Sequence, residues 1–576
     1  MTHDDEAIAA LIRIRDGSAA ADLETETLDF KEDRASTAET ERLLAEAAIC
    51  FANSAGGTVV LGVSDRQRGP AALTGTALDP ARIRQRIYEL SRPHLVVEVS
   101  SYPAHPSVLL VHVPQSADIH SDTQGRAFRR INRDCLPMDP SQQERLREER
   151  RGIDWSAQPA GIGIAAVVPE AMATARRMLL TLTDLRRSLA QLGDRDLLAA
   201  LGGLAGDGGL NRGGAVMFVA PGAALPDLIV YQFRATPGGD PRSVERLPAP
   251  GIMAFARAME LIGARQSSTA IALPNGQRLE IEDFPSLAVR EALSNAVCHR
   301  DYHLAGSIQI EHSPSVLLIS SPGPLVAGVT PQNILTTPSR PRNGALTKIA
   351  RSLGLAEETG RGVDRMYREM IRSGRPVPTI ESDAHQVRVV LTGGAPNANI
   401  ARFVADLPED EREDTDTMLI LMHLCARRNI TAELAAPLLQ RSAAEAEAVL
   451  RRLASDAVGL IERTRHSTGR STGVYRLRGE PLRRLGTAVA YHRRGTDETD
   501  RKIVAHVRDY GRITNRTLQN FLDVGVYKAR DIIADLAERG VLSRISVQQR
   551  GPHVAWGKGP NFPVGKPRRT RQEKTD

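Results

Sequence analysis

The 576-residue sequence is poor in aromatic residues and in cysteine, and it lacks any long apolar run. Aromatic side chains make up only 4% of the chain, so a surface of stacked rings for binding bases is not expected. Without about 18 consecutive apolar residues, a multi-pass membrane protein is excluded. The acidic start, MTHDDEAIAA, lacks the apolar segment of a secretory signal.

The four cysteines are widely spaced, with no CxxC pair and no Cys/His cluster. This spacing argues against a zinc module and against a disulfide framework, and it is typical of a reducing cytoplasm. The Walker A pattern GxxxxGK[ST] is also missing, which argues against a helicase motor. We therefore expect a cytoplasmic protein that has no membrane segment and is not a helicase.

The charge is placed unevenly along the chain. The net charge is only +6, but residues 493–576 hold 18 Lys and Arg against 10 Asp and Glu. A basic end on a near-neutral body favours a polyanionic partner, most simply nucleic acid. A solubilising tail would explain the same charge equally well.

The hydrophobic pattern divides the sequence into several expected parts. Alternating helical and strand-like segments predict α/β domains, and two similar patterns of three helices plus a hairpin predict tandem winged helix-turn-helix units. The fold class is therefore multidomain α/β plus winged helix. The expected parts are an α/β domain (1–154), a linker (155–172), an accessory α/β domain (173–282), a second α/β domain (283–393), a linker (394–413), two winged helices (414–480 and 497–562) and a basic tail (563–576).

The first part contains three ordered segments: LETETLDFK at 23–31, FANSAGG at 51–57 and LGVSD at 61–65. The glycine pair at 56–57 allows a turn from helix to strand without Cβ clashes. Together the segments resemble the Schlafen-type AlbA-like domain over about residues 20–150. The resemblance implies nucleic-acid binding, with the candidate contacts Lys31, Arg126, Arg129 and Arg130.

Some members of that family hold a divalent metal with three carboxylates and cleave RNA. The matching positions here are Glu24, Asp29 and Asp65, and hard oxygen donors suit Mg²⁺ or Mn²⁺. Position 29 carries Asp where the family pattern has Glu, which shortens its reach. The same acids can also be surface residues beside a strand, so a nuclease remains an alternative here.

In the segment REALSNAVCHRDY at 290–302, Glu291, Asn295 and His299 recur at four-residue steps and share one helix face. Such a polar stripe suits a pocket better than an apolar core. The segment resembles the N-box of GHKL ATPases, and more closely the ATPase-like C-terminal domain of RecG-related proteins. The resemblance implies a GHKL-like α/β sandwich that binds ATP and Mg²⁺, with Glu291 as the base and Asn295 on the metal.

Later motifs of that family match SerProGly at 321–323 and ETGRGV at 358–363. Glycines let backbone N–H groups approach phosphates closely. Enzymes of this family recognise adenine with an Asp at the position where this chain has Ser321. Whether the chain hydrolyses ATP therefore stays open. The alternative is that the polar residues of the 290–302 segment form only a structural hydrogen-bond network. The remaining candidate nucleotide contacts are His299, Arg300, Gly323, Gly360 and Gly362.

The third helix of a winged helix-turn-helix enters the major groove, and its hairpin follows the backbone. In the second unit Tyr527, Lys528 and Arg530 begin that helix, and Arg550 lies in the wing. We expect these residues to contact DNA, with an affinity that falls as salt rises. Winged helices also serve protein contacts, which is the alternative.

Three functions follow from these patterns. The first is a DNA-binding transcriptional regulator with the ATP-binding domain as a nucleotide switch. The second is a metal-dependent nuclease of the Schlafen type acting in anti-phage defence, and the third is a nucleotide-sensing scaffold that binds protein. The expected partners are DNA or RNA, a nucleotide and further copies of the chain in a homo-oligomer.

Overall fold

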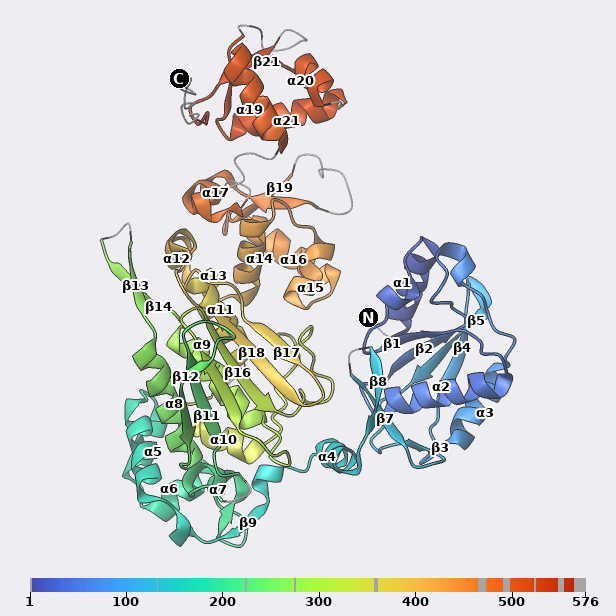
Figure 1. The fold of residues 1–576 in the computed structure, drawn as a ribbon, viewed down its shortest axis with the longest axis vertical. Helices are drawn as coiled ribbons and strands as arrows, with labels where there is room; N and C mark the ends of the chain where they lie inside the picture. Colours follow the sequence, from blue (N-terminus) through green and yellow to red (C-terminus); the bar gives the residue numbers. More distant parts are fainter. Residues whose placement is uncertain are drawn as a thin grey trace, which may run out of the picture. The chain divides into compact units, whose positions relative to one another are not determined.

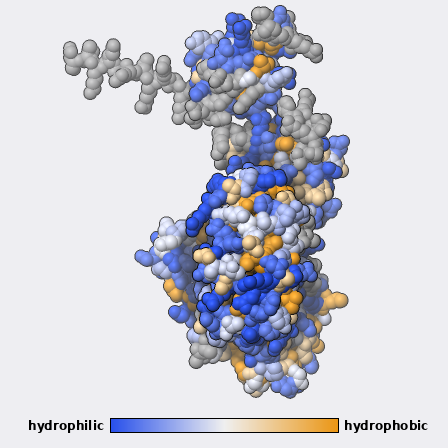
Figure 2. Space-filling view, turned by 90° about the vertical axis from the view of Figure 1, so that its right-hand side faces the viewer, coloured by the Kyte–Doolittle hydropathy of each residue, from blue (hydrophilic) through white to orange (hydrophobic). Residues whose placement is uncertain are grey.

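The computed structural model describes residues 3–131, 133–222, 225–273, 276–356, 361–464, 473–490, 498–522, 525–546, 548 and 554–563. The chain divides into two compact units, Met1–Met422 with Thr431–Tyr475, and His423–Ile430 with Arg476–Asp576. None of the helices in the described ranges is both long enough and apolar enough to span a bilayer. On the face drawn in Figure 2 hydrophilic residues dominate, because most large apolar side chains lie in buried cores.

The N-terminal α/β domain is built on a four-stranded sheet in the order β1-β2-β5-β4 (Figure 1). Strand β1 is parallel to β2, and β5 is antiparallel to both of its neighbours. Helices and strands alternate in this domain, as the hydrophobic pattern predicts. The bounds of the strands are β1 Leu28–Lys31, β2 Gly57–Leu61, β4 Glu98–Tyr102 and β5 His105–Val113.

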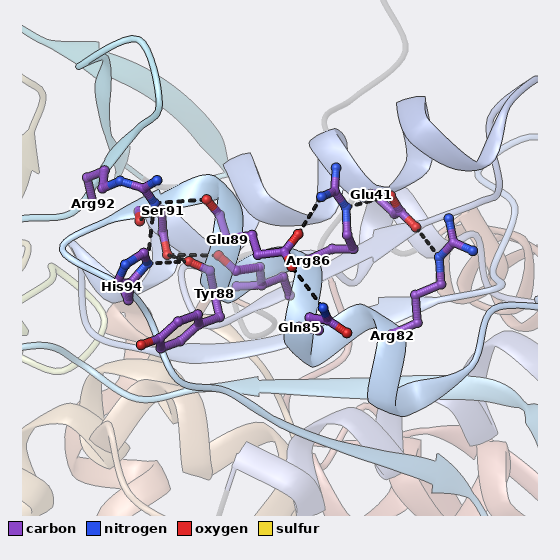
Figure 3. Close-up of polar contacts among 10 residues, drawn as sticks. Glu41, Arg82, Gln85, Arg86, Tyr88, Glu89, Ser91, Arg92 and His94 are labelled. Atoms are coloured by element: carbon purple, nitrogen blue, oxygen red, sulfur yellow. Dashed lines mark hydrogen bonds and ion pairs between the residues drawn. The ribbon is translucent and has the colours of Figure 1, made fainter.

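Helices α2 (Thr37–Ala52) and α3 (Pro80–Leu90) pack on this sheet through a shared apolar core. The carboxylate of Glu41 in α2 is buried and accepts bonds from Arg82 (2.6 Å) and Arg86 (2.9 Å) of α3 (Figure 3). Because one buried carboxylate joins two cations, α3 is fixed along α2. The other elements are α1 His3–Arg15, α4 Pro140–Arg150, β3 Ser91–Arg92, β6 Ser121–Asp122, β7 Ala127–Ile131 and β8 Asp134–Met138.

The glycine pair turns the chain from α2 into β2, as the sequence predicts. Gly56 and Gly57 both have positive φ, +78° and +147°, and a Cβ on Gly57 would lie 2.3 Å from the Thr27 carbonyl oxygen. Only glycine allows this approach, because any side chain would separate β1 from β2.

The hairpin β7–β8 is held against the C-terminal end of α2. The Asn53 amide donates to the Phe128 carbonyl (2.9 Å), and the Ser54 hydroxyl accepts from the Arg130 N–H (2.7 Å). Cys50 and Cys135 form a disulfide between α2 and β8. The expectation that the cysteines form no disulfide is therefore wrong for this pair, which the fold brings together across 85 residues of sequence.

The central region contains a six-stranded sheet in the order β12-β11-β15-β16-β18-β17. Alternating burial along β15 and β16 shows that one face is covered, and α9 packs on β16 (Figure 1). This arrangement is an α/β sandwich. The strands are β11 Ile229–Arg234, β12 Pro241–Leu247, β15 Ile308–His312, β16 Val316–Pro322, β17 Thr379–Ser382 and β18 Gln386–Thr392.

The expected accessory domain, 173–282, shares this sheet. Strand β11 pairs in parallel with β15, and one hydrophobic core runs from Ala171 to Leu391. The expected boundary at residue 282 thus falls within a continuous sheet and core. The helices are α5 Pro169–Thr181, α6 Asp194–Leu201, α7 Arg212–Phe218, α8 Gly251–Arg265, α9 Ser286–His299, α10 Gly344–Ser352 and α11 Gly362–Arg372. Two small sheets complete the region, one formed by β9 Pro159–Ile162 with β10 Leu210–Asn211 and one by β13 Ser268–Ala272 with β14 Arg278–Glu282.

The segment 394–413, expected to be a linker, contains two short helices. Ile400 and Phe403 of the first are buried, so their apolar contacts keep this stretch folded. Three further helices and a strand pair follow in the predicted order. The elements are α12 Ala398–Ala405, α13 Glu409–Arg412, α14 Thr415–Ala426, α15 Ala432–Leu439, α16 Ala443–Ala454, β19 Ile461–Arg463 and β20 Tyr475–Leu477.

The last part also has three helices and a sheet of three short strands, in the order β21-β23-β22. Its core gathers Ile503, Leu518, Ile533 and Leu542 from the helices and the sheet. The order of elements agrees with the sequence pattern, and its assignment as a winged helix remains a prediction. The elements are α19 Glu498–Tyr510, β21 Ile513–Thr514, α20 Asn515–Leu522, α21 Val526–Glu538, β22 Leu542–Arg544 and β23 Ala555–Lys558, and the helix α17 Gly479–Leu485 precedes them in the chain.

Candidate nucleotide pocket and acidic site

The polar stripe of α9 faces a cavity of about 150 Å³. Glu291, Asn295 and His299 all line this cavity, so the helix brings the three side chains together as the four-residue spacing predicts. The opposite walls are largely apolar and come from β16, α11 and the segment Gly323–Pro341, which we call the covering loop. Polar groups on an apolar background are typical of a ligand site.

The side chains of Asn295 and His299 have no hydrogen-bond partner among the described residues. Burial, followed by the positive charges of Arg342 and Arg351, lowers the pKa of His299 to about 4. The imidazole is therefore neutral near pH 7 and offers one donor and one acceptor. Unmade hydrogen bonds on partly buried polar groups favour a ligand that completes them.

Glu291 is buried at the same site, and its carboxylate lies against α11. Arg365 is 3.8 Å from Glu291 Oε1, and a Cβ on Gly362 would lie 2.3 Å from Glu291 Oε2. Position 362 thus requires glycine because the Glu291 carboxylate approaches the backbone there. The sequence had instead suggested that a glycine at this position lets a phosphate approach the backbone. Arg365 was missed because its relation to Glu291 depends on how α11 packs on α9.

The SerProGly segment at 321–323 forms the edge of the cavity next to the covering loop. The Ser321 hydroxyl donates to the Ala296 carbonyl (2.8 Å), so its proton is already engaged. Gly323 has φ +99°, and a Cβ there would lie 2.5 Å from the Asp301 Cβ. Both residues therefore fix the end of β16 against the helix, and the acid that reads adenine in related enzymes has no counterpart at Ser321.

Arg300 has a different role from the nucleotide contact expected. Its guanidinium is fully buried and donates to the backbone carbonyls of Asp301 (2.8 Å) and Leu304 (2.8 Å). It does not line the cavity. A guanidinium whose bonds go to its own loop shapes that loop, so we withdraw Arg300 from the nucleotide site.

The acidic residues of the N-terminal domain lie close together but are partly neutralised. Asp29 is buried, and its Oδ2 is 2.7 Å from Lys31 Nζ and 3.6 Å from Arg130 Nη1. Burial, followed by the charge of Asp29 and a hydrogen bond with it, raises the pKa of Glu24 to about 7. Partial burial is also the largest cause of the raised pKa of Asp65. Glu24 therefore gains and loses its proton near neutral pH.

This donor set does not fit a resident divalent cation. Within the described ranges no group of three or more His, Cys, Asp or Glu side chains is arranged to hold a metal. Lys31 also occupies the contact to Asp29 that a cation would take. The charge that a metal would balance is thus balanced by the protein's own cations.

The basic residues beside this site divide into an exposed and a buried set. Along β7, Arg130 shares the inward face with Phe128, lies over the Phe51 ring at 4.8 Å and donates to the Thr25 carbonyl (3.0 Å). It joins β7 to β1 and is withdrawn as a nucleic-acid contact. The alternation of the strand could have revealed this, since position 130 follows position 128 by two. Arg129 is on the other face and partly exposed.

In the last part, Tyr527 is exposed in the first turn of α21 and Arg530 lies over its ring at 6.0 Å. Both side chains are exposed, and their contact with DNA remains a prediction. Gly360, Arg550 and the side chain of Lys528 lie outside the described residues.

Comparison with family models identifies two segments. Residues 24–139 match the family described as "Schlafen, AlbA_2", and residues 306–391 match that described as "Putative ATP-dependent DNA helicase recG C-terminal". Helix α9 lies before the second match. The first match contains the acidic site, and the second contains β15 to β18 and α11.

No curated protein matches the chain. Among solved structures, the DIP2311 protein from Corynebacterium diphtheriae is similar, with 26% sequence identity and a TM-score of 0.51. The alignment covers 85% of this chain and 100% of that one. The similarity therefore extends well beyond the two family segments.

Proposed function

We propose that this chain, which combines an AlbA-like domain with an ATPase-type domain, is a cytoplasmic, homo-oligomeric DNA-binding transcriptional regulator controlled by a nucleotide. The observation that carries the proposal is the pair of partly buried side chains, Asn295 and His299, which face a cavity beside the buried Glu291 and have no hydrogen-bond partner among the described residues. Buried polar groups in proteins are nearly always hydrogen-bonded, so the missing partner points to a ligand.

In this proposal ATP with Mg²⁺ occupies the α9 pocket, and the nucleotide supplies the negative charge that the site binds. The Asn295 amide oxygen suits a hard cation, and neutral His299 can donate to an oxygen of the ligand. Glu291 would orient a water molecule, but Arg365 and α11 hold its carboxylate. A pocket of about 150 Å³ is smaller than a typical ligand site, so the covering loop must open for entry.

DNA binding is assigned to the C-terminal helices, taken as winged helix-turn-helix units, and to the AlbA-like domain. Exposed Tyr527 and Arg530 start the helix that would enter the groove. Lys31, Arg126 and Arg129 are the remaining candidates in the first domain. The basic balance of residues 493–576 supports a polyanionic partner.

The test is duplex DNA affinity, measured by fluorescence anisotropy with and without a non-hydrolysable ATP analogue and Mg²⁺. We expect the analogue to change the affinity at least fivefold, because typical coupling between sites is about 1–3 kcal/mol. Raising salt should weaken binding steeply. A salt-independent affinity would instead favour the protein-binding scaffold, and an unchanged affinity with bound analogue would exclude the switch.

A second candidate is the Schlafen-type nuclease, which the near-neutral pKa of Glu24 favours. A carboxyl that gains and loses a proton near pH 7 is suited to general acid–base catalysis. Among the described residues, the donors of the acidic site do not converge on a metal. Incubation of labelled RNA and DNA with Mg²⁺ or Mn²⁺ tests this candidate, and cleavage lost in Asp65→Ala would establish it.

A further inference from the structure

The covering loop of the nucleotide pocket is fastened to the turn between α15 and α16 by Gln440. The Leu335 N–H donates to Gln440 Oε1 (2.7 Å), and Gln440 Nε2 donates to the Pro331 carbonyl (2.9 Å). The Thr336 hydroxyl donates to the Gln440 backbone carbonyl (3.0 Å). One residue therefore binds the loop at three points through its side chain and its backbone.

Gln440 is held in an unusual conformation. It has φ +55°, and it is the sole non-glycine residue with positive φ in the part of the chain that the structure describes. The left-handed region is unfavourable for a residue with a Cβ. The bonds to the loop offset this cost, so the turn and the loop stabilise each other.

The same stretch of loop that meets Gln440 also closes the cavity. Ile334 lines the pocket, and its neighbour Leu335 donates to Gln440. The cavity of about 150 Å³ is too small for a nucleoside triphosphate, so a ligand of that size must displace Ile334. Because the two residues are adjacent, this displacement strains or breaks the bonds to Gln440.

We propose that Gln440 is a latch that keeps the covering loop closed and passes nucleotide occupancy to the α15–α16 turn; the proposal rests on the proposed function. The α15–α16 turn is also joined to α14, because Arg441 Nε lies 3.0 Å from Asp416 Oδ2. Opening of the covering loop thus releases a turn within residues 414–480, the segment expected to form the first winged helix. The nucleotide acts because it binds the open state better than the latched one.

The test compares the full chain with Gln440→Gly, which removes the side chain but accepts the left-handed backbone without strain. A non-hydrolysable ATP analogue with Mg²⁺ should bind this variant about tenfold more tightly, since the loop opens without breaking two hydrogen bonds. Hydrogen exchange of residues 331–337 and 440–442 should accelerate in the wild type when the analogue is added. In the variant it should be fast throughout. Ala444→Gly, an exposed position in α16, is the matched control and should behave as the wild type.

Equal analogue affinity in wild type and Gln440→Gly would overturn the latch, as would binding that leaves exchange of the turn unchanged. If neither chain binds the analogue, the proposed function fails, and the coupling fails with it. Binding by the variant but not by the wild type would support the latch in its strongest form, a pocket locked in the free protein. Slow exchange of Leu335 in the variant would show that the loop is held by other contacts.

Discussion

The α9 pocket and the acidic site of the AlbA-like domain both gather polar residues, but they differ in how those residues are satisfied. In the pocket, Asn295 and His299 face a cavity without hydrogen-bond partners among the described residues. In the acidic site, Asp29 is paired with Lys31 and Arg130, and the pKa of Glu24 is raised by burial, by the charge of Asp29 and by a hydrogen bond with it. Polar side chains without hydrogen-bond partners favour the binding of a ligand, whereas side chains that are already paired stabilise the fold.

The largest effect is expected where the acidic site is anchored. Cys135→Ser removes the disulfide that closes an 85-residue separation and holds β8, whose paired strand β7 carries Arg130. The free energy of unfolding of the AlbA-like domain should fall by about 2–5 kcal/mol. Urea unfolding followed by hydrogen exchange of residues 57–61 and 105–113 measures this loss.

Reductant should destabilise the wild type by a similar amount and leave Cys135→Ser unchanged. Nucleotide binding in the α9 pocket should not respond to either treatment, because the disulfide belongs to the other site. A loss of nucleotide affinity in Cys135→Ser would mean that the two sites do not act separately.

The next effect concerns the pocket itself. Gly362→Ala places a Cβ 2.3 Å from the Glu291 carboxylate, so α11 must move away from α9. We expect a loss of about 1–3 kcal/mol in stability and weaker nucleotide binding. Thermal unfolding and analogue titration provide the two measurements.

Gly263→Ala in α8 is the matched control. Apart from its chain neighbours and the nearby backbone of α8, no atom lies within 4 Å of a Cβ built there, and alanine favours a helix over glycine by up to about 1 kcal/mol. The control should therefore be neutral or slightly stabilising. A Gly362→Ala protein as stable as this control, with normal nucleotide binding, would show that Glu291 is not held by α11.

The smallest effect separates the two sites by pH. The pKa of Glu24 is raised from 4.5 to about 7, so the folded state holds more protons than the unfolded state between these values. The stability that Glu24 contributes is present below pH 4.5 and is lost as the pH rises through 7. Glu24→Gln should remove this slope and be more stable at pH 8 by about 1 kcal/mol after allowance for solvent screening.

Urea unfolding at pH 5 and pH 8 tests this prediction. An unchanged pH slope in Glu24→Gln would mean that Glu24 is not the group that titrates. Added Mg²⁺ should not alter the slope, since Lys31 already balances the charge of Asp29. If the pH dependence of stability disappears only when Mg²⁺ is added, the result would favour a metal-dependent nuclease.

Local features of the fold could be predicted from the sequence. The turn from helix to strand at residues 56–57 was predicted because glycine adopts backbone conformations that other residues avoid. The shared helix face of Glu291, Asn295 and His299 was predicted from their four-residue spacing. The roles of Arg130 and Arg300 did not follow. A guanidinium can reach a distant ligand or a nearby backbone carbonyl, and only the tertiary packing decides between them.

Contacts across long stretches of sequence were also beyond prediction. Cys50 meets Cys135, β11 joins the sheet of β15, and Gln440 reaches the covering loop, each across many intervening residues. No local pattern encodes such pairs, because loop closure over long distances leaves many alternatives of similar free energy.

The most direct test of the account is calorimetric titration of the full chain with a non-hydrolysable ATP analogue and Mg²⁺, repeated on Asn295→Ala. We expect saturable binding to the wild type and at least tenfold weaker binding to the variant, because a hydrogen bond to a charged ligand contributes about 1.5–3 kcal/mol. Exposed Arg13→Gln in α1 is the control and should bind normally. Absence of binding to both the wild type and Gln440→Gly, or equal binding to the wild type and Asn295→Ala, would contradict the claim that Asn295 and His299 form a nucleotide site.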